Sequence, residues 1–163
     1  MFDRMGALEK SLERQIGFVR AAESRVAFLM SALTLSLGVW IAGFHAVEIG
    51  VASVIIGCLA LILLICSFYN LWLSLYPNMR GPKNSLIYFG GITDRPLEDF
   101  YTCMMDVSEE DYRADLVEQI YVNAEIAKKK FKQAKLAMFF WFGSLVPLTI
   151  FLVLSIEGLL SGS

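Results

Sequence analysis

"VAFLMSALTLSLGVWIAGFHAV", residues 26–47, decides the class of this fold, because the stretch contains no Asp, Glu, Lys or Arg. Residues 49–79 and residues 136–156 are likewise free of these four residue types. An α-helix needs roughly 20 mainly apolar residues to cross the hydrocarbon core of a bilayer, and each of the three runs is long enough. The sequence therefore predicts an all-α integral membrane protein with three transmembrane helices.

The rest of the composition narrows the class of function. The chain has 163 residues, of which 56% are hydrophobic, and its net charge of −2 is too small to indicate a nucleic-acid binder. Its three cysteines show neither a disulfide framework nor the spacing of a metal site. The sequence has no P-loop and no Ser-His-Asp set, and the apolar runs carry no charge for ion coupling. These features predict a membrane protein that is not an enzyme.

The basic residues predict the orientation of the chain in the membrane. All 14 Lys and Arg residues lie within residues 1–25 and 80–135. An excess of Lys and Arg marks the cytoplasmic loops of membrane proteins. We therefore expect the N-terminus and residues 77–135 to be cytoplasmic, and the C-terminus to lie on the outer side of the plasma membrane.

The chain divides into four predicted segments. They are a cytoplasmic N-terminal amphipathic helix (1–25), a two-helix transmembrane hairpin (26–76), a cytoplasmic module (77–135) and a third transmembrane helix (136–160). In the first segment apolar side chains recur at three- and four-residue steps between Met5 and Val19. This stripe can lie on the membrane surface or pack on another cytoplasmic helix. We favour packing, because the helix can continue directly into the first span.

The cytoplasmic module is predicted to be a small insert of a short extended segment and helices. "NSLIYFGGIT", residues 84–93, is a β-branched and aromatic run with a glycine turn, which predicts a strand or an extended segment. Pro96 then opens a short helix. Ser108 can cap a further helix, which meets no Gly or Pro before Gly143 and so can run unbroken into the third span.

Several of these segments together resemble a known family. "NSLIYFGGI" (84–92), "LEDFY" (97–101) and "LVEQIYVNAEIAKKKFKQA" (116–134), placed between the second and last spans, are similar to the Pycsar transmembrane effectors of bacterial anti-phage defence. The resemblance covers roughly residues 10–150. It implies a protein of the bacterial inner membrane that senses a cyclic pyrimidine mononucleotide made by a partner cyclase. Such effectors then disrupt the membrane, so that the infected cell dies before the phage multiplies. No cofactor besides this activating ligand is implied.

The cytoplasmic module, residues 77–135, holds the candidate ligand-sensing residues. A nucleotide site needs an aromatic face for the base, cations for the phosphate and hydrogen-bonding groups for the base edge. The ten candidates are Arg80, Lys83 and Arg95 for charge, Tyr88 and Phe89 for stacking, Asn84, Ser85, Gln119 and Asn123 for hydrogen bonds, and Gly90 for close backbone approach. The alternative for Tyr88 and Phe89 is core packing, and for Asn84 a place in a turn.

Three helices are too few to enclose a pore, so the active form is expected to be a homo-oligomer in the lipid bilayer. Two other functions remain open at this point. One is a non-enzymatic membrane scaffold whose cytoplasmic helices dock a protein partner. The other is an effector of a cyclic-oligonucleotide system, because the two-span effectors of those systems resemble this chain in organisation. Binding of a cyclic mononucleotide would distinguish a Pycsar effector from the scaffold and from the cyclic-oligonucleotide effector.

Overall fold

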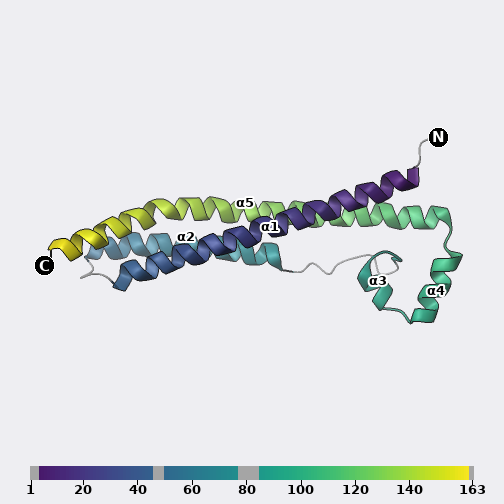
Figure 1. The fold of residues 1–163 in the computed structure, drawn as a ribbon, viewed down its shortest axis with the longest axis horizontal. Coiled ribbons are helices and arrows are strands. Elements are labelled where there is room, and N and C mark those ends of the chain that lie inside the picture. The colour runs from purple at the N-terminus through teal and green to yellow at the C-terminus, as the bar shows by residue number, and fades with distance from the viewer. Residues whose placement is uncertain (1–3, 46–49, 77–84, 162–163) are drawn as a thin grey trace. The chain divides into compact units, whose positions relative to one another are not determined.

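The computed structural model describes residues 4–45, 50–76 and 85–161. Every element in these ranges is a helix (Figure 1). In chain order they are α1 (Arg4–His45), α2 (Val51–Leu75), α3 (Phe89–Thr93), α4 (Leu97–Asp106) and α5 (Glu109–Ser161). Three of them, α1, α2 and α5, are long and apolar enough to cross a membrane. The predicted all-α architecture is therefore confirmed for the described residues, and it contains three candidate membrane spans.

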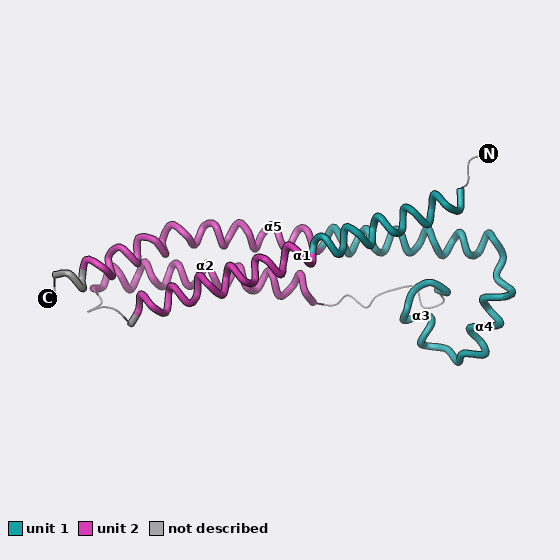
Figure 2. The backbone as a smooth tube through the Cα atoms, in the orientation of Figure 1, with its two compact units in different colours: residues 1–22, 77–129 teal, residues 23–76, 130–163 magenta. Residues whose placement is uncertain are grey.

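The chain forms two compact units, which Figure 2 shows in different colours. Unit 1 comprises residues 1–22 and 77–129, and unit 2 comprises residues 23–76 and 130–163. The helices α1 and α5 each contribute one part of their length to unit 1 and the other part to unit 2. Unit 2 therefore contains the apolar part of α1, the whole of α2 and the apolar part of α5, whereas the short helices α3 and α4 belong to unit 1.

The predicted N-terminal helix is not a separate element. Residues 4–25 and the first apolar run form one uninterrupted helix, α1. Between them lies "RAAESRV", residues 20–26, which contains neither glycine nor proline and no strong helix stop. Because nothing in this stretch ends a helix, the amphipathic part passes directly into the span.

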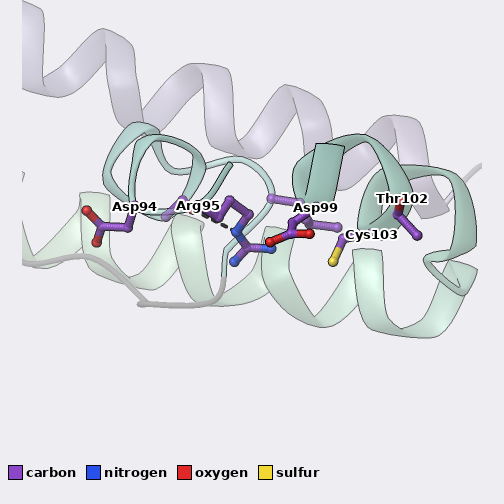
Figure 3. A pocket seen from close by; sticks show the side chains of 7 residues that line it. Asp94, Arg95, Asp99, Thr102 and Cys103 are labelled. Atoms are coloured by element: carbon purple, nitrogen blue, oxygen red, sulfur yellow. Dashed lines mark hydrogen bonds between the residues drawn. The ribbon is translucent and has the colours of Figure 1, made fainter. Parts of the chain in front are cut away.

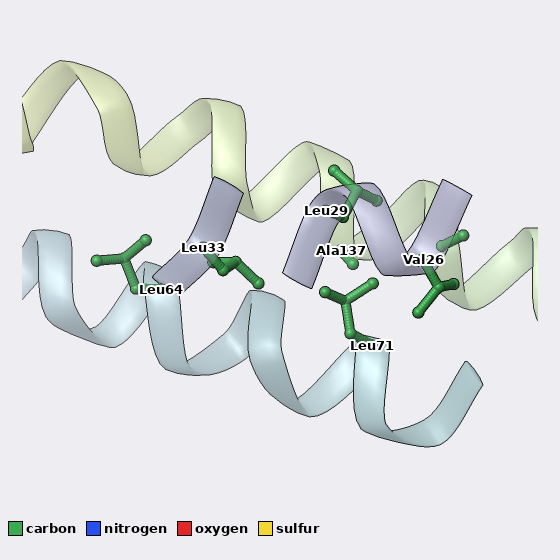
Figure 4. Packing of buried hydrophobic residues seen from close by; sticks show 7 residues of the cluster. Val26, Leu29, Leu33, Leu64, Leu71 and Ala137 are labelled. Carbon is green, nitrogen blue, oxygen red and sulfur yellow. The ribbon is translucent and has the colours of Figure 1, made fainter. Parts of the chain in front are cut away.

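Buried residues of unit 2 follow a seven-residue repeat. The buried positions of α2 are Gly57, Ala60, Leu64, Ser67, Leu71 and Ser74, and those of α5 in this unit include Ala134, Ala137, Ser144, Leu148, Phe151 and Ser155. Alternating steps of three and four residues form the contact seam of helices that supercoil around one another. Figure 4 shows one part of this seam, a single buried cluster to which α1 contributes Leu33, α2 contributes Leu64 and Leu71, and α5 contributes Ala137. Small residues at the seam allow the backbones to approach closely.

Polar side chains in unit 2 bond from one helix to another. The Ser67 hydroxyl donates to the carbonyl oxygen of Ala137 at 2.7 Å, and the Trp40 indole N–H donates to the carbonyl oxygen of Gly57 at 2.9 Å. Because the hydrocarbon core offers no water, such groups must find partners within the protein. These bonds therefore hold α1, α2 and α5 together without breaking their apolar exterior.

The outer faces of the unit 2 helices expose large apolar side chains. Phe28 is 71% exposed, Leu35 is 72% exposed and Ile55 is 64% exposed. Contiguous apolar surface on this scale is rare on soluble proteins but normal where lipid is the solvent. The exposed faces thus agree with the length and composition of the three spans.

The expectation of a strand or an extended segment at residues 84–93 is wrong for residues 89–93, and Asn84 lies outside the described residues. Residues 86–88 form bends, with Tyr88 in an extended conformation, and residues 89–93 form the single-turn helix α3. A lone strand would leave its backbone donors without a partner. Here the N–H groups of Ile87 and Tyr88 both donate to the hydroxyl oxygen of Ser85, which turns the chain back on itself. The next residues then continue as a helical turn.

The predicted start of the last helix is confirmed. The backbone N–H of Asp111 donates to the hydroxyl of Ser108 at 3.1 Å, and three acidic residues occupy the first turn of α5. From there α5 continues without a break to Ser161, through the basic stretch at residues 128–135. The long helix expected from the lack of Gly and Pro is therefore present.

Candidate functional site

A buried serine organises the loop that precedes α3. Ser85 is 3% exposed, and its hydroxyl oxygen accepts the N–H groups of Ile87 and Tyr88 at 3.1 and 2.8 Å. The side-chain amide of Gln119, on α5, donates to the same oxygen at 3.1 Å. Since Gln119 is also 3% exposed, this bond lies inside unit 1. The loop at residues 85–88 is thereby attached to the long helix.

A second bond attaches the same loop one turn earlier on α5. The backbone N–H of Leu86 donates to Oδ2 of Asp115 at 2.8 Å. Asp115 and Gln119 are four residues apart, so they lie on one face of α5. The other carboxylate oxygen of Asp115, Oδ1, is buried and has no partner among the described residues. We call these two bonds, Leu86–Asp115 and Ser85–Gln119, the loop anchor.

Two aromatic rings and a glycine set the path of the chain into α3. The rings of Tyr88 and Phe89 lie with centroids 4.6 Å apart and planes inclined by 52°. A Cβ atom at Gly90 would lie 2.5 Å from Cε1 of Tyr88, which is closer than real Cβ atoms approach. A larger residue at this position would therefore force the Tyr88 ring to move.

A cleft lies between the loop, α3 and α4. It has a volume of about 750 Å³ and is lined by Leu86, Gly91, Asp94, Arg95, Asp99, Thr102 and Cys103. Figure 3 shows the Arg95 guanidinium extending toward Asp99, while the Nε–H of Arg95 donates to the carbonyl oxygen of Gly91 at 3.0 Å. This volume falls within the range of roughly 300–1,000 Å³ that is typical of small-molecule sites.

The lining of the cleft combines one cation with two carboxylates. Arg95 presents guanidinium N–H donors that suit a phosphate or carboxylate group of a ligand. Asp94 and Asp99 present acceptors that suit an amino group. Thr102 adds a hydroxyl, and Leu86 adds apolar surface. Such a lining fits a ligand that carries both a phosphate and an exocyclic amino group.

The ten predicted site residues differ in where the structure places them. Arg80, Lys83 and Asn84 lie outside the described residues. Arg95 lines the cleft, whereas Ser85 and Gln119 form one bond of the loop anchor. Tyr88, Phe89 and Gly90 contact one another, and the Asn123 amide donates to the backbone oxygen of Gln119 at 2.8 Å. Most of the described candidate site residues therefore make contacts within the protein. Among them, only Arg95 lines the cleft.

The sequence prediction did not include most of the cleft lining. Leu86, Gly91, Asp94, Asp99, Thr102 and Cys103 were not among the candidates. The sequence "LEDFYTCMMD", residues 97–106, contains a pattern that could have identified three of them. Thr102 lies three residues after Asp99, and Cys103 lies four residues after it. These steps place the three side chains on one face of a helix, opposite an apolar face.

Residues 7–156 match the family described as the Pycsar effector protein domain, PycTM. The chain belongs to this family. The match covers the three spans, the loop anchor and the cleft. Comparisons with curated proteins and with solved structures find no match.

Membership in the family settles the broad function. The chain carries a Pycsar effector membrane domain, which implies an anti-phage membrane effector activated by a cyclic nucleotide from a cyclase. Effectors of this family act by disrupting membranes and are generally not enzymes. The three candidate spans agree with a location in the lipid bilayer.

Proposed function

We propose that this Pycsar effector binds a cyclic pyrimidine mononucleotide in the α3–α4 cleft, assembles into a homo-oligomer and disrupts the inner membrane, which causes abortive infection. The observation that carries the proposal is the position of the cleft beside the loop anchor. The loop at residues 85–88 contributes Leu86 to the cleft lining and is bonded through Leu86 and Ser85 to α5. The same helix α5 continues into the third span.

The chemistry of the lining suggests how such a ligand is oriented. The cyclic phosphate carries the negative charge and belongs beside Arg95, the cation of the described lining. The base edge belongs beside Asp99, because a carboxylate accepts the exocyclic amino group of cytosine. Uracil has a carbonyl at that position and offers no donor there. The cleft therefore favours the cytosine nucleotide over the uracil nucleotide.

The remaining predicted residues stay within the proposal. Arg80, Lys83 and Asn84 directly precede Ser85 in the sequence and would supply further charge and hydrogen bonds to the ligand. They lie outside the described residues, so their part is assigned by sequence position and chemistry alone. Tyr88, Phe89, Gln119 and Asn123 hold the loop and α5 in place around the site.

Activation requires a ligand that binds one arrangement of the protein more tightly than another. A nucleotide that contacts Leu86 in the cleft acts directly on the loop that is bonded to Asp115 of α5. A shift of this loop changes the forces on α5, and α5 packs against α1 and α2 in unit 2. Because three helices cannot enclose a pore, the disrupted state requires several copies.

The proposal includes the topology inferred from the basic residues. The N-terminal part at residues 1–25 and the ligand-sensing module at residues 77–135 lie in the cytoplasm, where a cyclase releases its product. The hairpin at residues 26–76 and the last helix at residues 136–160 cross the membrane, with the C-terminus outside. Reporter fusions at the two termini test this orientation directly.

Calorimetric titration of the detergent-purified protein with cyclic CMP, cyclic UMP, cyclic AMP and a cyclic dinucleotide tests the ligand. We expect saturable binding of cyclic CMP that is lost in Arg95→Ala and kept in Arg20→Ala, which removes an exposed arginine of α1. Asp99→Asn should shift the preference toward cyclic UMP by roughly 5- to 150-fold, because an amide can donate to the uracil carbonyl.

The same titration separates the alternatives. Binding of the cyclic dinucleotide alone would identify an effector of a cyclic-oligonucleotide system and overturn the mononucleotide assignment. Absence of binding to all four nucleotides would favour a scaffold that docks a protein partner. For a protein that binds, release of an entrapped dye from liposomes upon addition of the nucleotide then tests membrane disruption.

A further inference from the structure

The helix α4 leaves its apolar side uncovered. None of its ten residues is buried in unit 1. Leu97 is 80% exposed, Tyr101 is 62% exposed and Met105 is 66% exposed. Together with Phe100 and Met104 they form an apolar stripe at helical spacing. A strongly amphipathic helix with its apolar side open to the surroundings marks an interaction surface.

The opposite side of α4 faces the cleft. Asp99 and Thr102 line the cavity, and at 3.6 residues per turn they lie roughly opposite Leu97 and Met104. One short helix therefore contacts the ligand site with its polar side and offers its apolar side to a partner. Any movement of α4 toward or away from the ligand moves the apolar stripe as well.

The charges on α4 restrict the partner. The helix carries Glu98, Asp99 and Asp106 and contains no Lys or Arg. Glu98 lies at the edge of the apolar stripe, about two turns before Met105 along the same side. Helices that lie on anionic membrane surfaces have basic polar faces, so α4 does not fit a lipid surface. Two copies of α4 facing each other would place acidic residues together, which is unfavourable.

A complementary surface exists on α1 in the same unit. Lys10, Arg14 and Phe18 follow at four-residue steps and are exposed, so they share one open face. Gly17 lies beside this face, and a Cβ atom built on it would meet nothing within 4 Å. The face thus combines positive charge, an aromatic ring and room for close approach, and none of the described helices covers it.

We propose that the apolar, acidic face of α4 docks onto the Lys10–Arg14–Phe18 face of α1 in a neighbouring copy of this chain. This inference rests on the homo-oligomer of the proposed function and names its contact surface. The contact joins two different faces, so it is heterologous, and repeated around an axis it generates a ring. Because α4 also lines the cleft, a nucleotide bound there sets the position of the docking face and controls assembly.

Charge reversal tests the pairing. Glu98→Arg and Arg14→Glu each place like charges across the proposed contact and should lower the oligomer fraction by about tenfold or more. The double variant restores opposite charges and should recover assembly. Mass photometry of the detergent-purified proteins, with and without cyclic CMP and cyclic UMP, gives the oligomer fraction. Equal assembly in all four proteins, or loss in the double variant as in the singles, would overturn the interface.

Disulfide cross-linking gives a test that does not depend on charge. In a background with Cys58, Cys66 and Cys103 replaced by serine, Leu97→Cys and Phe18→Cys are made in separately tagged chains and mixed. We expect disulfides between Leu97→Cys and Phe18→Cys chains upon oxidation. Glu9→Cys, on the opposite side of α1 from Phe18, serves as the control and should not react. Preferential pairing of Leu97→Cys with itself would overturn the heterologous contact.

Calorimetric titration of the same variants separates this inference from the proposed function. Neither Glu98 nor Arg14 lines the cleft, so both single variants should bind the nucleotide as the parent protein does. If the parent binds none of the nucleotides, the proposed function fails. If the parent binds and assembles while both charge reversals assemble normally, only the α4–α1 contact fails.

Discussion

Unit 1 and unit 2 both expose apolar side chains, but the exposure has a different meaning in each. In unit 2 all three long helices present apolar residues outward, and small or hydroxyl-bearing residues occupy the contact seam. In unit 1 polar side chains such as Ser85 and Gln119 lie inside, whereas α4 leaves large apolar side chains exposed. Lipid solvates the exterior of unit 2, so helix association there depends on close fit and hydrogen bonds. An uncovered apolar stripe in unit 1 instead indicates a partner.

Removal of the largest buried ring should have the largest effect on unit 2. Phe151 is fully buried and packs against the Trp40 ring, at a centroid distance of 6.4 Å. Phe151→Ala should lower the free energy of unfolding in detergent by about 3 kcal/mol, the low end of the range for such cavities. The low end applies because the Phe151 ring of the parent protein is solvated by apolar detergent, and not by water, when the helices separate. Ile150→Ala, which removes an exposed side chain, is the control. Equal losses for the two variants, measured by thermal unfolding, would contradict the packing of unit 2.

The packing of the seam around the Phe151 ring can also be tested by adding a side-chain atom beside it. A Cβ atom at Gly43 would lie 2.7 Å from Cε1 of Phe151, whereas one at Gly38 would meet nothing within 4 Å. Gly43→Ala should therefore cost about 2 kcal/mol of bundle stability by overpacking. Gly38→Ala should be neutral or stabilising, because alanine has the higher helix propensity. A common shift of the unfolding midpoint in both variants would mean that the seam is looser than described.

Loss of the loop anchor should affect unit 1 and leave the spans intact. Ser85→Ala removes the acceptor of the Tyr88 N–H and of the Gln119 amide. Leaving these buried donors unsatisfied should cost about 1.5 kcal/mol of local stability. Amide hydrogen exchange at residues 86–88 should rise, and nucleotide affinity should fall. Thr93→Ala, whose exposed hydroxyl bonds only within its own helical turn, is the control. Unchanged exchange at the loop would show that the anchor does not hold it.

The smallest expected effect comes from a single hydroxyl between spans. Ser67→Ala removes the bond to the Ala137 carbonyl, which links α2 to α5. Interhelical bonds of this kind in membrane proteins contribute about 0.6 kcal/mol on average. Ser31→Ala removes a hydroxyl that donates within its own helix and should change the unfolding free energy less. A loss above about 2 kcal/mol for Ser67→Ala would exceed the largest value known for such bonds.

The sequence alone determined the class, the spans and the family. Three runs such as residues 26–47 contain no charged residue, so lipid suits them as a solvent better than water does. This inference needs no knowledge of which residues contact one another. The cap at Ser108 and the unbroken α5 also follow from local rules, because capping and helix propensity act within a few residues. The strand or extended segment expected at residues 84–93 is wrong for residues 89–93, because the pattern was judged without the competing serine turn.

Only the tertiary structure decided which side chains form the site. Arg95 was predicted from its charge, but Asp99 and Thr102 reach the cleft because α4 turns its polar side toward α3, and Ser85 became an anchor because Gln119, 34 residues later, lies beside it. Contacts between residues so far apart depend on how helices pack, which the local pattern does not specify. The sequence determined the three candidate membrane spans, because length and apolar composition are local properties, and the packing of α3, α4 and α5 decided where the candidate cleft lies.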